Sequence, residues 1–384
     1  MIQKVVISTH TWATGFPESE LKKYLNQKQI SQLLWIGHPL TYHPRLNGSS
    51  FELYHHGQLS KSSYRKIVKI PSLLAYIKDI WLNIWYVWKT KETYDYYIGI
   101  DNLNAFSGWI LKKLGKTKYC IYYVIDFTPK RFENKLINKL YHALETFCAK
   151  HCDETWNLSH TLIEGRQKFK GVSPYCGIQR VVPMGIWFHE VKRVEFAAVQ
   201  KQQLVFMGHI LEKQGIQYVL DAIPLIIKKI PDFNFLVIGE GEYLSDLKSK
   251  AQRLDIESYV DFKGYVEKHE ELEYLIASSA VAIAPYQEGD YERNFTYYTD
   301  SGKIKTYLGA GVPVLLTKVP HNAETLQNLQ CGKVITLDSQ SIANAVCELL
   351  INEAKLLTYR NNALNYAKQF DWQIVFDNAF FGNS

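Results

Sequence analysis

Short apolar runs alternate with helical patterns along almost the whole chain, and this alternation constrains the fold more than any other feature. The strand-like runs of the first half are residues 4–8, 32–38, 94–101, 119–126, 154–159 and 179–184. Helical patterns fall between several of these runs, at 18–28, 72–90 and 133–150. Strands that alternate with helices form parallel sheets whose two faces are both covered.

The alternation restarts after residues 186–202, a stretch of mixed charge without clear periodicity. Its strands are expected at 203–209, 233–241, 259–265, 281–286, 312–317 and 333–337, and its helices at 215–229, 243–254, 269–278, 302–309 and 340–350.

The length of 384 residues is enough for two separate cores. We therefore expect an α/β protein with two Rossmann-like, doubly wound parallel-sheet domains facing a cleft. These are an N-terminal domain over 1–190 and a C-terminal domain over 203–353, and a C-terminal helix within 354–384 is expected to return toward the first. Ligands of open α/β sheets bind outside the carboxyl ends of the strands, so the cleft is the expected site.

The composition limits the kinds of partner and location that we expect. The net charge of +6 is too mild to indicate a nucleic-acid binder, but it suits an anionic ligand or a membrane surface. Six unevenly spread cysteines and a start that reads directly as a strand predict a cytosolic protein with reduced thiols. No run approaches the roughly 20 apolar residues of a membrane span. Residues 70–91 combine aromatic residues and lysines at helical spacing, which fits either a core helix or an interfacial helix.

The stretch YYTDSGKIKTYLGAGVPVLLT, residues 297–317, contains a candidate phosphate site. Ser301, Gly302 and Lys303 fall where a helix begins at the carboxyl end of a strand. Free backbone N–H groups and a positive dipole end favour phosphate there, and Lys303 would add a full charge. The alternative is that Asp300 or Ser301 is an ordinary helix cap.

A second loop of this kind follows the strand at 203–208. Gly208 ends the strand, and His209, Lys213 and Gln214 precede the next helix. Two such loops at one end of one sheet indicate a diphosphate site. The alternative is that Lys213 is solvated and His209 only caps the turn.

These motifs resemble the retaining glycosyltransferases of the GT-B fold, in the group called family four. The resemblance is clearest over 203–350 and is carried by FMGHILEKQGIQYVLDAI, by PDFNFLVIGEGEYLSDLKSKAQRLDIESYVDFKGYV and by KIKTYLGAGVPVLLT. It implies a nucleotide-sugar donor on the C-terminal lobe, an acceptor on the N-terminal lobe, transfer with retained anomeric configuration, and no metal. The donor side implied in this way comprises Gly15, Gly208, His209, Gln214, Asp300, Ser301, Gly302, Ile304 and Thr306.

The chain departs from the pattern of this family at several positions. His209 and Gln214 stand where the family usually has Arg and Lys, and Thr306 stands where it has the second of two glutamates. The first glutamate has no clear equivalent in the loop that contains Glu288, Asp290, Glu292 and Asp300. Either the donor is handled differently or the site is damaged, and we favour the former.

The N-terminal half contributes fewer candidates. Asp126 ends a strand where relatives often carry a His-Asp pair, so it could orient the acceptor or accept its proton, although a strand-end carboxylate is often structural. Lys130 and Arg131, with Lys135 and Lys139 beyond them, fit either an anionic lipid surface or a solvated helix face.

Other motifs are weaker. Cys148, His151, Cys152 and His142 match no zinc spacing, so no metal is expected. Gly239 and Gly241 lack the third glycine of a dinucleotide fingerprint, and no P-loop occurs.

We therefore expect a hexosyl-type retaining glycosyltransferase in cell-surface polysaccharide or glycolipid synthesis, cytoplasmic with peripheral contact at the inner membrane face. Asp126, Lys213 and Lys303 are its expected catalytic residues, and it uses no cofactor beyond the donor. Two alternatives stay open: a non-catalytic GT-B partner subunit, and a nucleotide-sugar epimerase.

Overall fold

The chain divides into two compact units. A computed structural model describes residues 2–10, 15–39, 48–66, 72–170, 176–289 and 295–382. One unit comprises Met1–Pro183 together with Trp372–Ser384, and the other comprises Met184–Asp371. The first boundary therefore lies at 183/184 rather than near 190.

The first unit is built on an eight-stranded sheet of order β4-β3-β2-β1-β5-β6-β7-β8. The strands are β1 (Lys4–Thr9), β2 (Gln32–Gly37), β3 (Gly48–His55), β4 (Gln58–Lys66), β5 (Tyr94–Ile100), β6 (Thr117–Val124), β7 (Glu154–Asn157) and β8 (Ile178–Val181). Six of the predicted runs correspond to β1, β2, β5, β6, β7 and β8, and these strands pair in parallel as expected.

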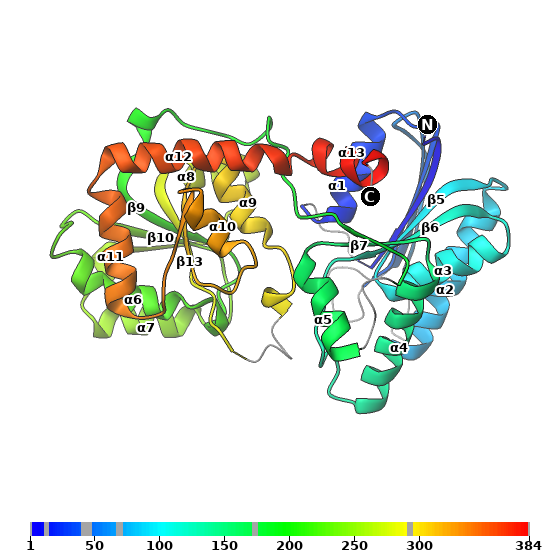
Figure 1. The fold of residues 1–384 in the computed structure, drawn as a ribbon, viewed down its shortest axis with the longest axis horizontal. Coiled ribbons are helices and arrows are strands. Elements are labelled where there is room, and N and C mark those ends of the chain that lie inside the picture. The colour runs from blue at the N-terminus through cyan, green and yellow to red at the C-terminus, as the bar shows by residue number, and fades with distance from the viewer. Residues whose placement is uncertain are drawn as a thin grey trace. The chain divides into compact units, whose positions relative to one another are not determined.

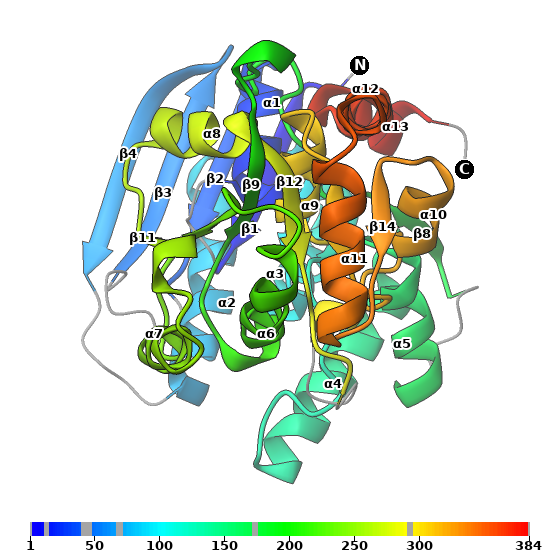
Figure 2. The same cartoon turned by 90° about the vertical axis from the view of Figure 1, so that its left-hand side faces the viewer.

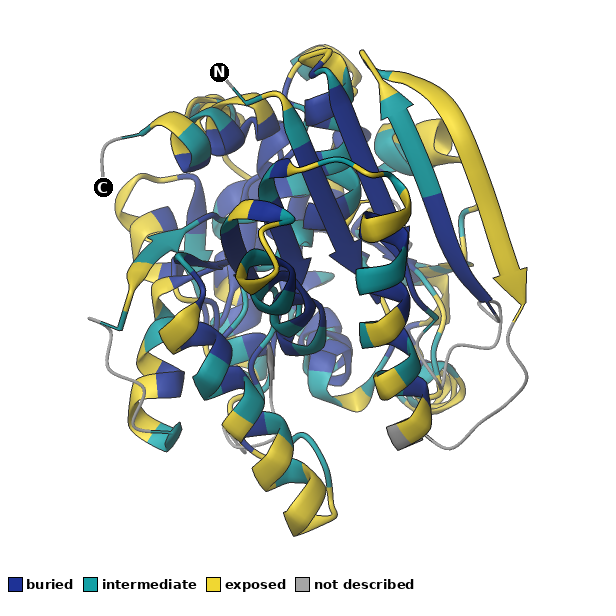
Figure 3. Cartoon of the chain, turned by 90° about the vertical axis from the view of Figure 1, so that its right-hand side faces the viewer, coloured by how far each residue is buried: buried dark blue, intermediate teal, exposed yellow. Residues whose placement is uncertain are grey.

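The hairpin β3–β4 corrects the expectation of a purely parallel sheet. β3 pairs antiparallel with both β2 and β4, and the two-residue turn between β3 and β4 places His56 and Gly57 at positive φ. Every residue of β4 is exposed, and Figure 3 shows it as the yellow strand at the sheet edge. An edge strand with this polar sequence carries no alternating apolar signal, so periodicity alone does not reveal it.

Six helices belong to the first unit among the described residues: α1 (Pro17–Gln27), α2 (Ser72–Lys89), α3 (Asn102–Lys113), α4 (Lys135–His151), α5 (His160–Lys170) and α13 (Trp372–Phe381). Because β1 and β2 are buried almost throughout, they form the centre of this core. None of the described helices combines the length and apolarity that a bilayer span requires.

The second unit is built on a parallel sheet of order β11-β10-β9-β12-β13-β14. Its strands are β9 (Gln200–Met207), β10 (Asn234–Ile238), β11 (Val260–Gly264), β12 (Ser279–Ala284), β13 (Val314–Leu316) and β14 (Gly332–Val334). Its helices are α6 (Ile216–Ile226), α7 (Leu244–Arg253), α8 (His269–Ser278), α9 (Gly302–Gly309), α10 (Ala323–Asn328), α11 (Ser339–Leu350) and α12 (Glu353–Ala367).

Alternate side chains of this sheet enter two cores. Leu204 and Phe206 of β9 pack with α6, α7 and α11, whereas Val205 packs with α8, α9 and α12 on the other face. Helices therefore cover both faces of this sheet, as Figures 1 and 2 show, and the predicted doubly wound arrangement is confirmed.

The expected C-terminal helix over 354–384 is in fact two helices in two units. Arg360 of α12 donates hydrogen bonds to the carbonyls of Ala277 and Ser279, at 3.0 and 2.7 Å, which ties α12 to the second unit. In α13, Asp377 accepts a hydrogen bond from the Tyr24 hydroxyl at 2.6 Å, and α13 packs on α1 of the first unit.

Candidate functional site

Glycines bring backbone segments close together at the carboxyl ends of β9 and β10. Gly208, Gly215 and Gly239 have φ of 143°, 77° and 135°. A Cβ at Gly239 would lie 2.0 Å from the Gly208 carbonyl oxygen, and one at Gly215 would lie 1.8 Å from that of Pro285. Since atoms cannot approach so closely, these loops need glycine at both positions.

Lys303, in the first turn of α9, lies against these loops. Its Nζ donates a hydrogen bond to the Gln214 Oε1 at 2.8 Å. The same nitrogen lies 4.5 and 5.0 Å from the ring centres of Phe206 and Tyr286. A Cβ on Gly208 would be 2.9 Å from it. Two predicted donor-side residues, Gly208 and Gln214, therefore lie together with Lys303, which was predicted to be catalytic.

Burial lowers the pKa of Lys303 to about 7. Burial is the only cause of this shift, and among the residues that the structure describes Lys303 forms no ion pair with a carboxylate. The amine therefore gains from any anion that approaches, because an adjacent negative charge favours its protonated form. Such a site can bind phosphate and stabilise a departing diphosphate.

Asp300 lies beside this site but points away from it. Its carboxylate accepts a hydrogen bond from the Met184 N–H at 3.0 Å and lies 3.2 Å from both Lys305 and His321. Burial by itself raises the pKa of Asp300, but the charge of Lys305 and the hydrogen bond to His321 hold that pKa below its ordinary value. The expected donor contact from Asp300 is therefore replaced by a structural ion pair.

The remaining predicted residues of α9 divide. Ser301 is the N-cap residue of α9, but its hydroxyl lies 2.8 Å from that of Tyr286 and makes no side-chain cap. Among the described residues, no side chain therefore caps the N–H groups at this helix start. Thr306 donates to the Gly302 carbonyl oxygen at 3.2 Å, within its own helix. Ile304 is fully buried in the core, so its side chain cannot contact a donor.

The second predicted loop is held by its backbone. Glu212–Gln214 form a short 3₁₀ turn, and the Lys213 carbonyl accepts a hydrogen bond from the Gln287 N–H at 3.1 Å. His209 is exposed. Beyond Glu288, which is also exposed, the acidic candidates Asp290 and Glu292 lie outside the described residues.

In the first unit, Asp126 pairs with Arg131. The Arg131 Nη1 lies 2.7 Å from the Asp126 Oδ1, so two residues assigned to different roles form one ion pair. Lys130 is exposed. The Gly15 N–H donates to the Glu20 carboxylate at 2.9 Å, and Gly15 has a φ of 86° with open space around it.

Sequence reasoning missed a buried polar cluster at the carboxyl ends of β1, β2 and β5. The His10 Nδ1 lies 2.6 Å from Asp101, and its Nε2 lies 3.2 Å from Asp79 of α2. Burial lowers the pKa of His10, but Asp101 and then Asp79 outweigh it and raise that pKa to about 10. Burial instead lowers the pKa of the neighbouring His38 to about 4. One imidazole is thus charged and the other neutral.

The positions of these residues in the sequence could have revealed the cluster. His10 and Asp101 directly follow β1 and β5, at or near the ends of two predicted strands, and the carboxyl ends of parallel strands meet at one edge of a sheet. Asp101 also has a φ of 72°, an unusual value for a residue other than glycine, and caps α3 through the N–H groups of Leu103 and Asn104. Asp101 is thereby fixed at the edge.

Glu18 is a second buried group that the sequence did not reveal. Both of its carboxyl oxygens are buried near the start of α1, and neither has a hydrogen-bond partner among the described residues. Burial raises its pKa to about 8, which keeps it protonated at neutral pH.

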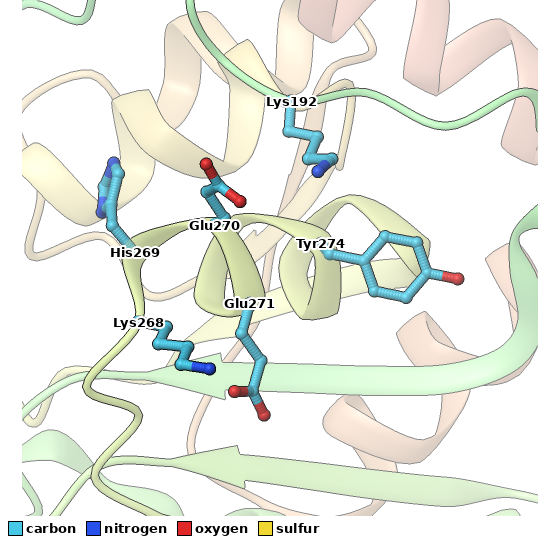
Figure 4. Close-up of a pocket in the computed structure, with 6 residues that line it drawn as sticks. All are labelled: Lys192, Lys268, His269, Glu270, Glu271 and Tyr274. Atoms are coloured by element: carbon cyan, nitrogen blue, oxygen red, sulfur yellow. The ribbon is translucent and has the colours of Figure 1, made fainter.

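Two other features do not form a site. In the described residues, no group of three or more His, Cys, Asp or Glu could hold a metal ion, and the six cysteines are free thiols. A pocket of about 630 Å³ at the start of α8 is lined by Lys192, Lys268, His269, Glu270, Glu271 and Tyr274 (Figure 4). Its charges are of both signs and it shares no residue with the Lys303 loops, so we place the candidate site at those loops.

The family model "Glycosyl transferases group 1" matches residues 201–352. This range contains Gly208 just after β9, Gln214 just before α6, and Lys303 in α9. The second unit carries a glycosyl transferases group 1 domain.

Curated relatives agree with this glycosyl transferases group 1 domain. The chain is 27% identical over 214 residues to the alpha-monoglucosyldiacylglycerol synthase of Streptococcus pneumoniae, covering 50% of this chain and 45% of that protein. It is 22% identical over 194 residues to a phosphatidyl-myo-inositol mannosyltransferase of Mycobacterium tuberculosis, covering 49% and 48%. The chain therefore spans less than half the length of these relatives.

Solved structures show the GT-B fold of the whole chain. HepE of Anabaena in complex with UDP superposes with a TM-score of 0.70 at 15% identity, over 98% of each chain. Sucrose-phosphate synthase of Thermosynechococcus elongatus superposes with a TM-score of 0.72 at 15% identity, again over 98% of each. The expected fold class is confirmed.

Proposed function

We propose that this protein is a retaining glycosyltransferase that moves a hexosyl-type sugar from a nucleotide-diphosphate sugar to a saccharide or lipid-linked acceptor. The product would belong to cell-surface polysaccharide or glycolipid synthesis. The observation that carries the proposal is the Lys303 amine, held between the Gly208 and Gln214 loops without a carboxylate partner in the described residues. A half-buried amine kept in this way suits a ligand that brings its own negative charge.

The rate would come mainly from electrostatic stabilisation of the departing diphosphate. In the reaction the bond from the sugar C1 to the phosphate oxygen breaks, a bond from C1 to the acceptor oxygen forms on the same face, and the acceptor proton passes to the departing phosphate. Lys303 and the uncapped N–H groups of α9 would bind the growing charge. Basic side chains and a helix start would then stabilise the departing diphosphate in place of a metal ion, and we propose metal-independent transfer.

The known relatives and structural neighbours indicate which compounds to test. HepE was solved with UDP and with UDP-glucose, which favours uridine diphosphate sugars as the first donors to screen. The relatives that act on diacylglycerol or phosphatidylinositol derivatives favour a lipid acceptor, which would place the protein at the inner face of a membrane. In the first unit, Asp126 and its partner Arg131 are the candidates for contact with the acceptor.

The test is calorimetric titration with UDP, GDP, ADP and CMP, on the native protein and on Lys303→Ala. We expect one nucleoside diphosphate to bind, and binding to weaken about tenfold or more in the variant, since the variant lacks a charged hydrogen bond. Turnover with the matching sugar nucleotide and nuclear magnetic resonance of the product's anomeric centre then test transfer and retention. Turnover that requires a divalent metal would contradict the metal-independent part.

The second candidate is a catalytically inactive GT-B subunit that serves as a partner for an active transferase. The departures at His209, Gln214 and Thr306 favour it, because the structure turns Thr306 back onto its own helix. It predicts no donor turnover with any acceptor and no loss of function in Lys303→Ala. A native protein that is folded and binds none of the four nucleotides would support this candidate.

A further inference from the structure

The N-terminal end of α4 exposes large apolar side chains. Leu136, Ile137 and Leu140, here called the α4 tip, are 66%, 47% and 59% exposed. Their spacing places them on one side of the helix. Figures 1 and 2 show α4 extending beyond the strands of its own sheet. A helix of a globular protein normally turns such a stripe toward a core, so this one is available to a partner.

The start of α2 exposes a second apolar stripe. Leu74, Ile77 and Trp81 recur at helical spacing, and each is more than half exposed. The opposite side of the same helix supplies Leu82 and Tyr86 to the core of the first unit. The core alternative for residues 70–91 is therefore confirmed along one side of the helix. The other side exposes an aromatic, apolar stripe, which is what the interfacial alternative requires.

The two stripes begin at the same edge of the first sheet. α4 follows β6. β6 pairs in parallel with β5, and β5 pairs in parallel with β1, so the three strands run in the same direction. α2 follows β4, which runs in the same direction as β2 because both are antiparallel to β3. Both helices thus start at the edge where the strands have their carboxyl ends, and β1 and β5 bring His10 and Asp101 to that edge.

The charges at this edge are mostly positive. Lys135 and Lys139 are exposed beside the α4 tip, and Arg65 and Lys66 are exposed at the end of β4, with Glu133 as an exposed acid among them. A second copy of the chain on a two-fold axis would place these cations against each other. An anionic lipid surface is instead complementary to them, and apolar side chains with flanking lysines are typical of interfacial binding.

We propose that the α4 tip and the stripe of Leu74, Ile77 and Trp81 form a docking surface for a membrane that contains anionic lipids. The apolar side chains insert at the headgroup boundary, and the lysines contact phosphate groups. This proposal extends the proposed function by naming the membrane partner of the acceptor-side unit, but its test uses neither donor nor turnover.

The experiment is sedimentation of the full chain with vesicles. One set is pure phosphatidylcholine, and the other contains equal parts of phosphatidylcholine and phosphatidylglycerol. The native protein should bind the mixed vesicles more tightly, and added salt should weaken that binding. Leu136→Ser with Ile137→Ser and Leu140→Ser should lower the partition coefficient about tenfold or more, because three apolar insertions are removed. Lys135→Gln with Lys139→Gln should lower it by about fivefold per lysine on the mixed vesicles only.

The matched control is Ile351→Ser with Leu357→Ser, which removes similarly exposed apolar side chains from the second unit. It should bind vesicles like the native protein. All variants should keep the native circular dichroism spectrum, since none removes a buried side chain. Vesicle binding by the triple variant equal to that of the native protein would overturn the proposal. The proposal would also be overturned if the native protein were a dimer, the triple variant were a monomer, and neither form bound vesicles.

The two proposals fail separately. Lys303→Ala should bind vesicles normally while losing nucleotide, whereas the α4 tip variant should bind nucleotide normally while losing vesicles. A native protein that binds no nucleotide would therefore contradict only the donor site. A native protein that binds no vesicles would contradict only the docking surface.

Discussion

Lys303 makes nucleotide binding depend on pH. Its pKa is about 7 in the free protein and rises when an anion is bound, so binding above that pH takes up a proton. Affinity for the nucleoside diphosphate should then fall as pH rises from about 7 to about 9, by at most about tenfold per pH unit. Calorimetry at about pH 8, in buffers with different ionisation enthalpies, measures the proton uptake directly.

Lys303→Arg is the control for this dependence. Arginine stays charged throughout this range, so the variant should bind nucleotide with little change in affinity between about pH 7 and 9. A pH dependence that persists unchanged in Lys303→Arg would show that another group titrates.

Glu18 should make the first unit less stable as pH rises. Its pKa is about 8 in the fold and near 4.5 when unfolded, so between these values the folded state holds a proton that the unfolded state releases. The free energy of unfolding contributed by Glu18 therefore falls from about pH 5 to about pH 8. Glu18→Gln should raise the midpoint of urea unfolding at about pH 8 and change it less at about pH 5.

The control is Glu164→Gln on α5, whose side chain is exposed. It should change the urea midpoint at neither pH, because surface substitutions usually alter stability by less than about 0.5 kcal/mol. An equal rise of the urea midpoint in Glu18→Gln at both pH values would mean that the packing of the Glu18 side chain, and not its protonation, limits stability.

Single residues of the site were predictable where the chain turns, and less so where side-chain direction matters. Gly208, Gln214 and Lys303 follow strand ends, and the topology of a parallel sheet brings such positions together. Asp300 and Ile304 lie in the same segment but are buried: Asp300 precedes α9, and Ile304 is on the inner side of this eight-residue helix. Sequence spacing across a loop does not reveal where that helix meets its core.

At the scale of elements, the sequence predicted every strand that the structure describes except β3 and β4, the hairpin whose outer strand is fully exposed. β12 is an apolar run buried at every residue, whereas β4 is exposed at every residue. Buried strands have apolar sequences because they are buried. An exposed edge strand lacks this pattern, so only the turn beside it can reveal it in the sequence. The His56-Gly57 turn is such a sign, although a weaker one than Asn-Gly.

The loops at the candidate site should fail when Gly239 acquires a side chain. In Gly239→Ala the new Cβ would lie 2.0 Å from the Gly208 carbonyl oxygen, and the backbone φ of 135° is unfavourable for alanine. We expect a loss of about 3 kcal/mol in the free energy of unfolding, together with weaker nucleotide binding as the Gly208 loop moves. Chemical denaturation and calorimetry measure the two effects.

Gly264→Ala is the matched control, because Gly264 also has a positive φ, of 75°, but a Cβ added there would have no atom within 4 Å. It should cost about 1 kcal/mol from backbone strain alone and leave nucleotide affinity unchanged. If both variants bound nucleotide equally well, close packing of the Gly208 and Gly239 loops would not matter for the site.

At the scale of the whole molecule, the chain completes its first unit with its last helix. Trp372 and Phe376 of α13 are buried and stack on each other, and Phe376 lies 5.2 Å from the Tyr24 ring centre in α1. The sequence indicated a helical C-terminus but not its break, because Arg360, which ties α12 to the second unit, acts through carbonyl groups about 80 residues away.

Phe376→Ala should therefore destabilise the first unit from the far end of the sequence. Removing a fully buried phenylalanine costs about 3–5 kcal/mol. In differential scanning calorimetry we expect one transition to move to lower temperature and the nucleotide-binding unit to keep its own. The nucleotide that binds the native protein should raise only that second transition, since a ligand stabilises the unit to which it binds. Phe381→Ala, which removes an exposed ring from the same helix, should leave both transitions unchanged. A single transition that Phe376→Ala lowers and nucleotide raises would instead mean that the two units unfold together, and that α13 stabilises the whole chain.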